Sequence, residues 1–244
     1  MSSKTGLNLT KNYSINFSLP KREKKLINFI IIHYTGMKKE SDAIKRLCDS
    51  KSNVSSHYFI KNNGKLLNLV PDLYEAWHAG KSSWKTFKSL NKYSVGIEID
   101  NPGHYHGYKE YTPKQILSLE KLLRYLMKRY NIKPQNVLGH SDIAPSRKKD
   151  PGEKFPWSKL AKKKLCIWHN LDINKIKAFS EVKLDVYQEN IFLKNLKKIG
   201  YFEKGKSNDK KMNIVKAFQR KFRQKLINGK IDQECLLISK NLLK

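Results

Sequence analysis

The sequence predicts an α/β domain followed by a smaller, wholly helical domain. A nearly continuous apolar run rich in β-branched residues, KLINFIIIHYTG at 25–36, is typical of a strand buried on both faces. An amphipathic helix pattern occupies 111–130, and strand patterns stop after about residue 168. We therefore expect a larger domain over residues 1–178 and a small three-helix domain over residues 179–244.

Two further segments predict strands. SHYFIKNNGKLLNLV, at 56–70, contains two apolar runs around Asn-Asn-Gly, which favours a hairpin. YSVGIEID, at 93–100, has apolar residues at alternate positions, with Gly96, Glu98 and Asp100 on the opposite face. A central strand that directs two carboxylates to one side is unusual, so this face is a candidate location for a site.

The clearest helix is YTPKQILSLEKLLRYLMKRY, at 111–130. Thr112 is expected as the N-cap, Pro113 takes the first helical position, and Gln115 completes a capping box. One face of this helix is apolar, through Ile116, Leu119, Leu123, Leu126 and Met127. A short strand, QNVLGH, then ends at His140.

Two of the seven histidines, His33 and His140, end predicted strands, and strand ends at the rim of an α/β sheet are common places for sites. Asp150 follows ten residues after His140, in a turn before Pro-Gly. A single histidine at a strand end is usually only hydrogen-bonded, but two imidazoles and a carboxylate together suit Zn²⁺ and leave a fourth position for water. We therefore predict one zinc ion per chain, bound by His33, His140 and Asp150.

The formal net charge of +29, from 50 basic and 21 acidic residues, points to an anionic partner. The basic residues are 43 Lys and only 7 Arg, however, and nucleic-acid recognition relies on the arginine fork. No nucleic-acid partner is therefore predicted. A general bias of composition toward lysine is the simpler interpretation of the charge, and an acidic polymer is the alternative.

The cysteines Cys48, Cys166 and Cys235 are far apart, which predicts neither a disulfide framework nor a cysteine metal site. The N-terminal residues contain no apolar stretch of signal-peptide length, and no run approaches the roughly 18 apolar residues of a membrane span. We expect a monomer without an integral membrane segment. The sequence as given predicts a cytoplasmic protein. If a leader sequence is missing from it, a periplasmic or cell-envelope location is expected.

Six motifs occur in order along the chain: IIIHYTG, VSSHYFI, EAWHAG, SVGIEIDNPG, VLGHSDIAPSRKKDPG and FPW. Together they resemble the zinc-dependent N-acetylmuramoyl-L-alanine amidases of the type 2 amidase and peptidoglycan recognition protein superfamily. The resemblance implies a mixed central β-sheet flanked by helices, with a shallow groove along the sheet rim. It also implies hydrolysis of the amide bond between the lactyl group of muramic acid and the L-alanine of the stem peptide, in peptidoglycan or muropeptides.

The resemblance assigns the catalytic acid/base to Glu98, the oxyanion-stabilising lysine to Lys148, and the metal ligands to His33, His140 and Asp150. These roles are chemically reasonable. Zinc lowers the pKa of water, Glu98 can pass a proton to the departing amine, and Lys148 can stabilise a developing oxyanion. Gly96, on the same strand face as Glu98, is interpreted as leaving room for the substrate.

Three residues in the motifs, His57, Trp77 and His78, are predicted to contact the substrate. Trp77 and His78 are expected at the edge of the groove, where an aromatic ring can stack on a sugar or peptide. For His57, support of the site and simple packing are alternatives. The loop KSSWKTFKSLNK, at 81–92, could place lysine and tryptophan side chains at the groove mouth.

In the C-terminal part, helices are expected around 185–199, 210–226 and 232–243. NIVKAFQRKFR, at 213–223, resembles the helix signature of the three-helix peptidoglycan-binding domain. The motif that usually follows is blurred, so a helical appendage that only packs on the amidase is the alternative.

For the whole chain, the alternative to an enzyme is a recognition protein that binds peptidoglycan or muropeptides without cleaving them. The presence of Glu98, Lys148 and Asp150 favours the enzyme, because a protein that only binds its ligand has no use for all three residues. The choice between intact peptidoglycan and a small anhydro-muropeptide as substrate stays open.

Overall fold

A six-stranded sheet forms the centre of the structure, a computed structural model that describes residues 9–203, 205 and 207–244. In hydrogen-bonding order its strands are β1 (Leu9–Lys11), β5 (Leu66–Asn68), β4 (Tyr58–Ile60), β9 (Ser94–Ile99), β3 (Phe29–Tyr34) and β10 (Val137–Gly139). Within this sheet β4 and β5 pair antiparallel and the other neighbours pair parallel. The predicted mixed central sheet is therefore confirmed, as is the hairpin at 56–70.

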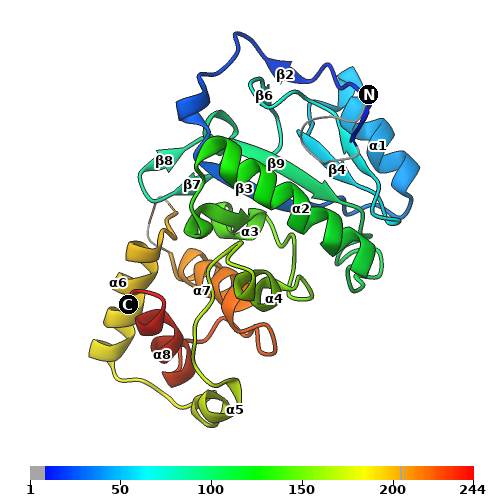
Figure 1. The fold of residues 1–244 in the computed structure, drawn as a ribbon. Helices are drawn as coiled ribbons and strands as arrows, with labels where there is room; N and C mark the ends of the chain where they lie inside the picture. The colour runs from blue at the N-terminus through cyan, green and yellow to red at the C-terminus, as the bar shows by residue number, and fades with distance from the viewer. Residues whose placement is uncertain (1–8, 204, 206) are drawn as a thin grey trace.

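Helices surround this sheet (Figure 1). They are α1 (Glu40–Cys48), α2 (Pro113–Tyr130), α3 (His140–Ile143), α4 (Trp157–Lys162), α5 (Ile173–Ile176), α6 (Val186–Ile199), α7 (Asn208–Phe222) and α8 (Gln233–Asn241). Two short antiparallel pairs, β2 (Phe17–Ser18) with β6 (Glu75–Ala76) and β7 (Ser83–Trp84) with β8 (Phe87–Lys88), lie outside the main sheet. Single turns of 3₁₀ helix occur at η1 (Lys24–Leu26), η2 (Ser50–Ser52), η3 (Leu90–Tyr93), η4 (Pro134–Asn136) and η5 (Lys177–Phe179).

Helix α2 begins as the sequence predicts. The Thr112 hydroxyl accepts a hydrogen bond from the Gln115 backbone N–H at 3.1 Å, and the Gln115 side chain accepts one from the Thr112 N–H at 2.9 Å. This capping box satisfies two of the N–H groups that a helix start leaves without partners. The apolar face of α2 packs on one side of the sheet, with Leu119, Leu123 and Leu126 fully buried.

Strand β3 separates two hydrophobic cores because its side chains alternate between the two faces of the sheet. Ile30 and Ile32 belong to the core beneath α2. Phe29 and Ile31 belong to a second core on the opposite face. His33 has the same parity as Phe29 and Ile31, so it faces the side of the sheet that α2 does not cover.

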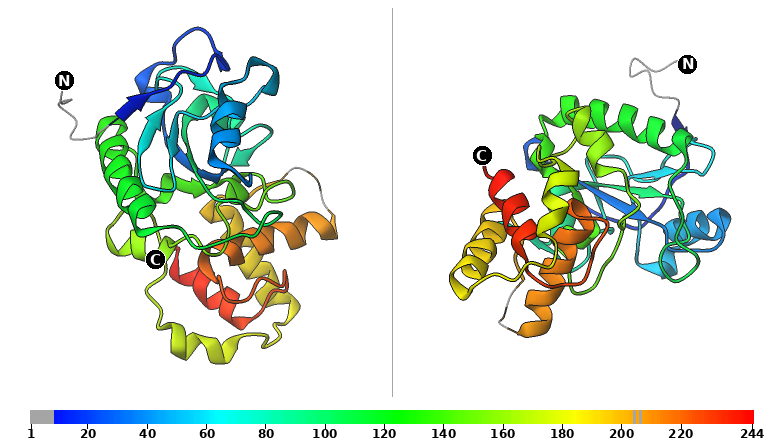
Figure 2. Two further views of the ribbon diagram at one scale, coloured as in Figure 1. Left: turned by 90° about the vertical axis from the view of Figure 1, so that its right-hand side faces the viewer. Right: turned by 90° about the horizontal axis from the view of Figure 1, so that it is seen from below.

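The second core is shared between the sheet and the C-terminal helices α6, α7 and α8. These correspond to the three predicted helices, except that α7 ends at Phe222, four residues before its predicted end. The members of this core from these helices include Phe192, Leu196, Val215, Phe218, Phe222, Cys235 and Ile238. In both views of Figure 2 the three helices lie together against the sheet body. The predicted division after residue 178 stays a prediction, but it falls between segments that bury one continuous core.

A buried ion pair crosses the same contact. Lys221 of α7 and Asp142 of α3 are each almost fully buried, with Lys221 Nζ 3.0 Å from Asp142 Oδ2. Lys221 also donates to the backbone carbonyl of Val137 at 3.1 Å, and the Tyr201 hydroxyl donates to Asp142 at 2.7 Å. Burying a charge is costly unless it is paired and hydrogen-bonded, and this network meets that condition.

The prediction that loop 81–92 brings a tryptophan to the groove mouth is wrong. Trp84 is buried in the second core, where its indole packs edge-on against Tyr201 with ring centroids 4.9 Å apart. Gly200 makes this contact possible, because a Cβ at that position would lie 2.3 Å from the indole ring. The physical reason is that burying a large apolar ring stabilises the folded protein more than leaving it exposed to water in a loop.

In the described part of the chain, no helix is both long and apolar enough to cross a membrane.

Candidate metal centre and active site

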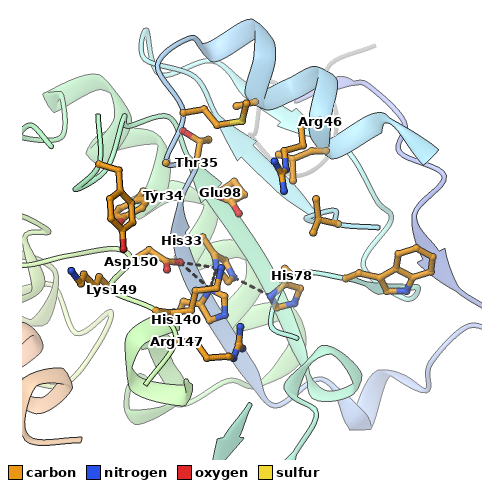
Figure 3. A pocket seen from close by; sticks show the side chains of 18 of the residues that line it. His33, Tyr34, Thr35, Arg46, His78, Glu98, His140, Arg147, Lys149 and Asp150 are labelled. Atoms are coloured by element: carbon orange, nitrogen blue, oxygen red, sulfur yellow. Dashed lines mark hydrogen bonds and ion pairs between the residues drawn. The ribbon is translucent and has the colours of Figure 1, made fainter. Parts of the chain in front are cut away.

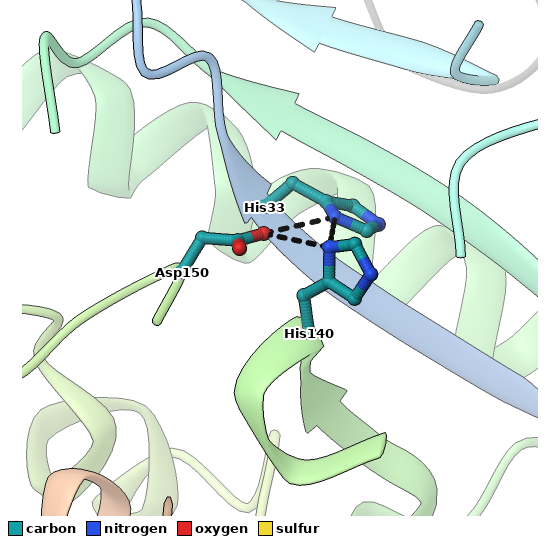
Figure 4. A group of neighbouring side chains, drawn as sticks. All are labelled: His33, His140 and Asp150. Atoms are coloured by element: carbon teal, nitrogen blue, oxygen red, sulfur yellow. Dashed lines mark hydrogen bonds and ion pairs between the residues drawn. The ribbon is translucent and has the colours of Figure 1, made fainter. Parts of the chain in front are cut away.

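Three side chains converge at one end of the central strands (Figure 4). His33 lies near the end of β3, and His140 begins α3 directly after the adjacent strand β10. Their Nδ1 atoms are 2.9 Å apart, and each lies 3.0 Å from Oδ2 of Asp150. All three residues are buried. The structure therefore brings together the three predicted metal ligands, and they form a group that could hold a metal ion.

The partner of His140 indicates which of its ring nitrogens is free. Nε2 lies 3.1 Å from the carbonyl oxygen of Ala79, which can only accept a hydrogen bond. Nε2 therefore carries the proton, and Nδ1, the atom that faces His33 and Asp150, has a lone pair. This arrangement, with one nitrogen held by a carbonyl and the other free, is typical of a metal-binding histidine.

A chain of hydrogen bonds assigns the same tautomer to His33. The Ser94 hydroxyl donates to the carbonyl of Leu90, so its oxygen accepts from His78 Nε2 at 3.2 Å. His78 Nδ1 then accepts from His33 Nε2 at 3.0 Å, which leaves His33 Nδ1 without a proton. The tautomers follow from these partners and not from observed hydrogens.

Three atoms with lone pairs thus lie within about 3 Å of one another. Such atoms repel unless a cation lies between them, and a metal ion with nitrogen and carboxylate ligands satisfies all three.

The protonation states of these residues also suit a metal. Burial and the neighbouring His140 lower the pKa of His33 to about 4. Burial alone would raise the pKa of Asp150, but His140 and His33 lower it well below its usual range by charge and hydrogen bonds. A neutral imidazole and an ionised carboxylate are the forms that bind metals.

Glu98 lies beside the metal-binding group. It is the register partner of His33 across the parallel pair of β3 and β9, and it faces the same side of the sheet. Among the described residues its Oε2 atom has no hydrogen-bond partner although the atom is buried. Burial and the charge of Asp150 raise the pKa of Glu98 well above its usual value, and Lys148 partly opposes them. A carboxyl group with a raised pKa and a free oxygen is suited to proton transfer.

These side chains line a groove of about 550 Å³ (Figure 3). Lys148 lies in its wall, near enough for its charge to influence the pKa values of Glu98 and His33. Trp77 lines the groove as well, and its indole N–H donates to the Ser18 hydroxyl at 2.9 Å, which fixes the ring. The structure therefore places Glu98, Lys148 and Trp77 in one cavity with the metal ligands, and their roles stay predictions.

His57 is placed differently from the other predicted substrate contacts. It is 0% exposed and does not line the groove. Its Nδ1 accepts the backbone N–H of Gly96 at 3.0 Å, and Nε2 lies 3.0 Å from the carbonyl of Tyr74 and 3.1 Å from Nη2 of Arg22. This position favours support of β9 over contact with the substrate.

The interpretation of Gly96 as space for the substrate is wrong. A Cβ at Gly96 would lie 2.4 Å from Cγ of His78, so the space belongs to the His78 ring. His78 thereby reaches His33 and Ser94, a supporting role that the sequence did not indicate. His78 and Ser94 come from separate segments, and only folding brings them together.

Replacing His78 with alanine is expected to weaken metal binding by about 10- to 100-fold, the usual effect of losing a group that orients a ligand. His33 would lose the acceptor that fixes its tautomer. Competition with a chelator of known affinity measures the change, and His106→Ala, in an exposed loop, is the matched control. Unchanged affinity in His78→Ala would contradict the hydrogen-bond chain.

Two buried imidazoles and a carboxylate beneath an open groove form a group that could hold a metal ion, and the carboxyl group and lysine beside it make the arrangement suited to a hydrolase. Residues 22–153 match the family model described as N-acetylmuramoyl-L-alanine amidase. The chain belongs to this N-acetylmuramoyl-L-alanine amidase family, whose reaction is hydrolysis of the amide between muramic acid and L-alanine.

Individual relatives agree with the family assignment. The chain is 35% identical to N-acetylmuramoyl-L-alanine amidase AmiD of Escherichia coli strain K12 over 231 residues, which cover 89% of the chain and 83% of AmiD. The solved AmiD complex with anhydro-N-acetylmuramic acid-L-Ala-D-γ-Glu-L-Lys superposes with a TM-score of 0.77 at 32% identity, covering 93% and 91% of the two chains. AmpDh3 of Pseudomonas aeruginosa in complex with anhydromuramic pentapeptide gives 0.78 at 28% identity, covering 92% and 93%.

Proposed function

We propose that the chain hydrolyses the amide between the lactyl group of muramic acid and L-alanine with one Zn²⁺ held by His33, His140 and Asp150. The observation that carries the proposal is the convergence of three lone-pair atoms beneath the groove. Two imidazoles and a carboxylate form a ligand set that catalytic zinc sites use, with a position left open.

In this proposal the reaction needs a Lewis acid, a proton carrier and a group that stabilises negative charge. Zinc, when bound, supplies the Lewis acidity that activates water at neutral pH. Glu98 takes the proton from the attacking water and delivers it to the departing alanine nitrogen, a transfer that its raised pKa favours. Lys148, in the groove wall, donates to the oxyanion that develops on the former carbonyl.

The proposed substrate is a muropeptide of the anhydro type. Two solved relatives hold anhydro-N-acetylmuramic acid-L-Ala-D-γ-Glu-L-Lys and an anhydromuramic pentapeptide, and the chain covers more than nine-tenths of both. Intact peptidoglycan carries the same bond and is the second candidate. All proposed ligands and catalytic groups lie in one chain, which supports a monomer as the working unit.

The test is incubation of the purified protein with anhydro-muramoyl-L-Ala-D-γ-Glu-L-Lys and, separately, with intact sacculi. We expect release of the tripeptide, loss of activity on chelation and recovery with zinc. His140→Ala should lose the bound zinc, whereas His106→Ala should keep one ion per chain. A protein that binds the muropeptide but releases no peptide would instead be a recognition protein, and full zinc content in His140→Ala would contradict the ligand assignment.

A further inference from the structure

Helix α7 forms part of the groove wall. Asn213, Lys216 and Arg220 are spaced by three and four residues, so they share one face of the helix, and all three line the groove. We call this the groove face of α7. The Asn213 amide donates to the Ser146 hydroxyl at 3.3 Å, which attaches the helix to the loop that leads to Asp150. The C-terminal region therefore borders the site of the reaction.

Among the described residues, the side chain of Arg220 has no hydrogen-bond partner. It is 8% exposed, and among the described residues it donates no hydrogen bond, even from its buried Nε atom. Its Nε atom forms a long ion pair, 4.0 Å, with Oε2 of Glu153, and this oxygen also contacts His104 Nε2 at 3.0 Å. Leaving the buried Nε–H donor without an acceptor is unfavourable. An acceptor from outside the protein would satisfy it.

The groove has an excess of positive charge. Two carboxylates, Glu98 and Asp150, line it together with six cationic residues, Arg46, Arg147, Lys148, Lys149, Lys216 and Arg220. Several of these cations are already engaged. The Arg147 guanidinium donates to the carbonyls of Ala79 and Lys81, and the Lys149 ammonium lies over the Tyr105 ring. Of the two cations of α7, Lys216 has no hydrogen bond or ion pair among the described residues, and Arg220 has only the long contact with Glu153, so both are available to an anionic part of the substrate.

We propose that Arg220, assisted by Lys216, binds the α-carboxylate of the γ-linked glutamate in the stem peptide. This inference rests on the proposed function. A glutamate joined through its γ-carboxyl keeps a free α-carboxylate, and it is the second residue of the peptide, roughly 6 Å from the bond that is cleaved. Arg220 is near enough to the metal ligand Asp150 for their charges to interact. An arginine fork binds a carboxylate through two parallel hydrogen bonds.

The test compares two substrates that differ in one group, anhydro-muramoyl-L-Ala-D-γ-Glu-L-Lys and the same compound with the glutamate α-carboxylate converted to an amide. The wild-type protein should favour the carboxylate by about 10- to 100-fold in kcat/KM, as expected for a hydrogen bond between charged groups. Arg220→Gln should lose this preference, because its kcat/KM falls for the carboxylate and hardly changes for the amide. A merely structural role for Arg220 would lower both values equally.

Three further variants complete the experiment. Arg124→Gln, on the exposed face of α2, is the matched control and should behave as wild type. Arg220→Lys keeps the charge and should recover part of the preference. Lys216→Gln should show the same selective loss to a smaller degree, which keeps the test decisive if Arg220→Gln does not fold.

The outcomes separate the two proposals. A wild-type protein that cleaves both substrates equally well would overturn the carboxylate site and leave the proposed function intact. Equal losses on both substrates in Arg220→Gln would also overturn the carboxylate site alone. If Arg220→Gln does not fold, an unchanged preference in Lys216→Gln would overturn it. A wild-type protein that cleaves neither these two compounds nor intact sacculi would contradict the proposed function, and the carboxylate site with it. Cleavage of sacculi alone would overturn the carboxylate site only.

Discussion

Glu98→Gln is expected to lower kcat by about 10²- to 10⁴-fold, the contribution typical of a positioned acid or base, with metal content unchanged. Glutamine keeps the shape of the side chain but cannot accept and return a proton at neutral pH. Glu98 is not one of the converging ligand atoms, so the metal-binding group stays complete. The loss should therefore fall on turnover and not on binding of the ion.

The same variant should fold at least as stably as the wild type in the metal-free state. The folded-state pKa of Glu98 is raised above the unfolded value, so ionisation opposes folding increasingly as the pH rises above that unfolded value. Glutamine carries no charge and removes this penalty at neutral pH. The carboxyl oxygen Oε2 also has no hydrogen bond to lose among the described residues.

Turnover of the anhydro-muramoyl tripeptide, zinc content and a thermal melt of the same preparation check this expectation. Glu110→Gln, at an exposed position, is the matched control. A Glu98→Gln protein that works at close to the wild-type rate would show that another group carries the proton. A variant that loses its metal would indicate that Glu98 acts as a ligand.

The metal ligands could be predicted from the sequence because each has a local pattern. His33 and His140 end apolar runs, and Asp150 precedes a Pro-Gly turn. The alternation in β9 likewise predicts which face carries Glu98. In each case the neighbouring residues determine the strand, and the strand determines the direction of the side chain.

The supporting residues could not be predicted in this way because their roles depend on tertiary packing. In the sequence, Arg220 and Lys221 are adjacent cations within a helix pattern, yet Arg220 lines the groove and Lys221 pairs with buried Asp142. The orientation of α7 against the sheet separates them. Similarly, His78 can support His33 only because Gly96, which has no side chain, leaves space for the imidazole ring of His78.

Asp142 connects the C-terminal helices to the metal site. It lies two residues after His140, and its Oδ2 atom accepts the backbone N–H of Gly139 at 2.8 Å, at the start of α3. Its charge is balanced by Lys221, and its second oxygen accepts the Tyr201 hydroxyl. Both partners come from the region after residue 178. The geometry around His140 therefore depends on residues from the predicted C-terminal domain.

Removal of residues 179–244 is accordingly expected to destabilise residues 1–178 severely and to abolish metal binding. Phe29, Ile31 and Leu138 would lose the part of their core that the C-terminal helices supply. Asp142 would also keep a buried charge without Lys221, and losing one partner of a buried pair typically costs about 3–5 kcal/mol. That is a large share of the roughly 5–15 kcal/mol that stabilises an ordinary domain.

A thermal melt and the zinc content of residues 1–178 measure this effect, and full-length Lys221→Met isolates the part due to the ion pair. Lys221→Met should melt at a lower temperature than the wild type, because Asp142 stays buried without its cation, but it should remain folded because the apolar core is intact.

If the C-terminal helices were instead a separate wall-binding module, the fragment should behave in the opposite way. It should melt cooperatively, bind zinc and cleave soluble muropeptide normally, but sediment less with sacculi. A fragment with those properties would show that the C-terminal helices add affinity for the wall and do not hold the active site together. Because the shared core and the Asp142 network lie on the face of the sheet that carries His33, we expect the fragment to lose fold and metal together.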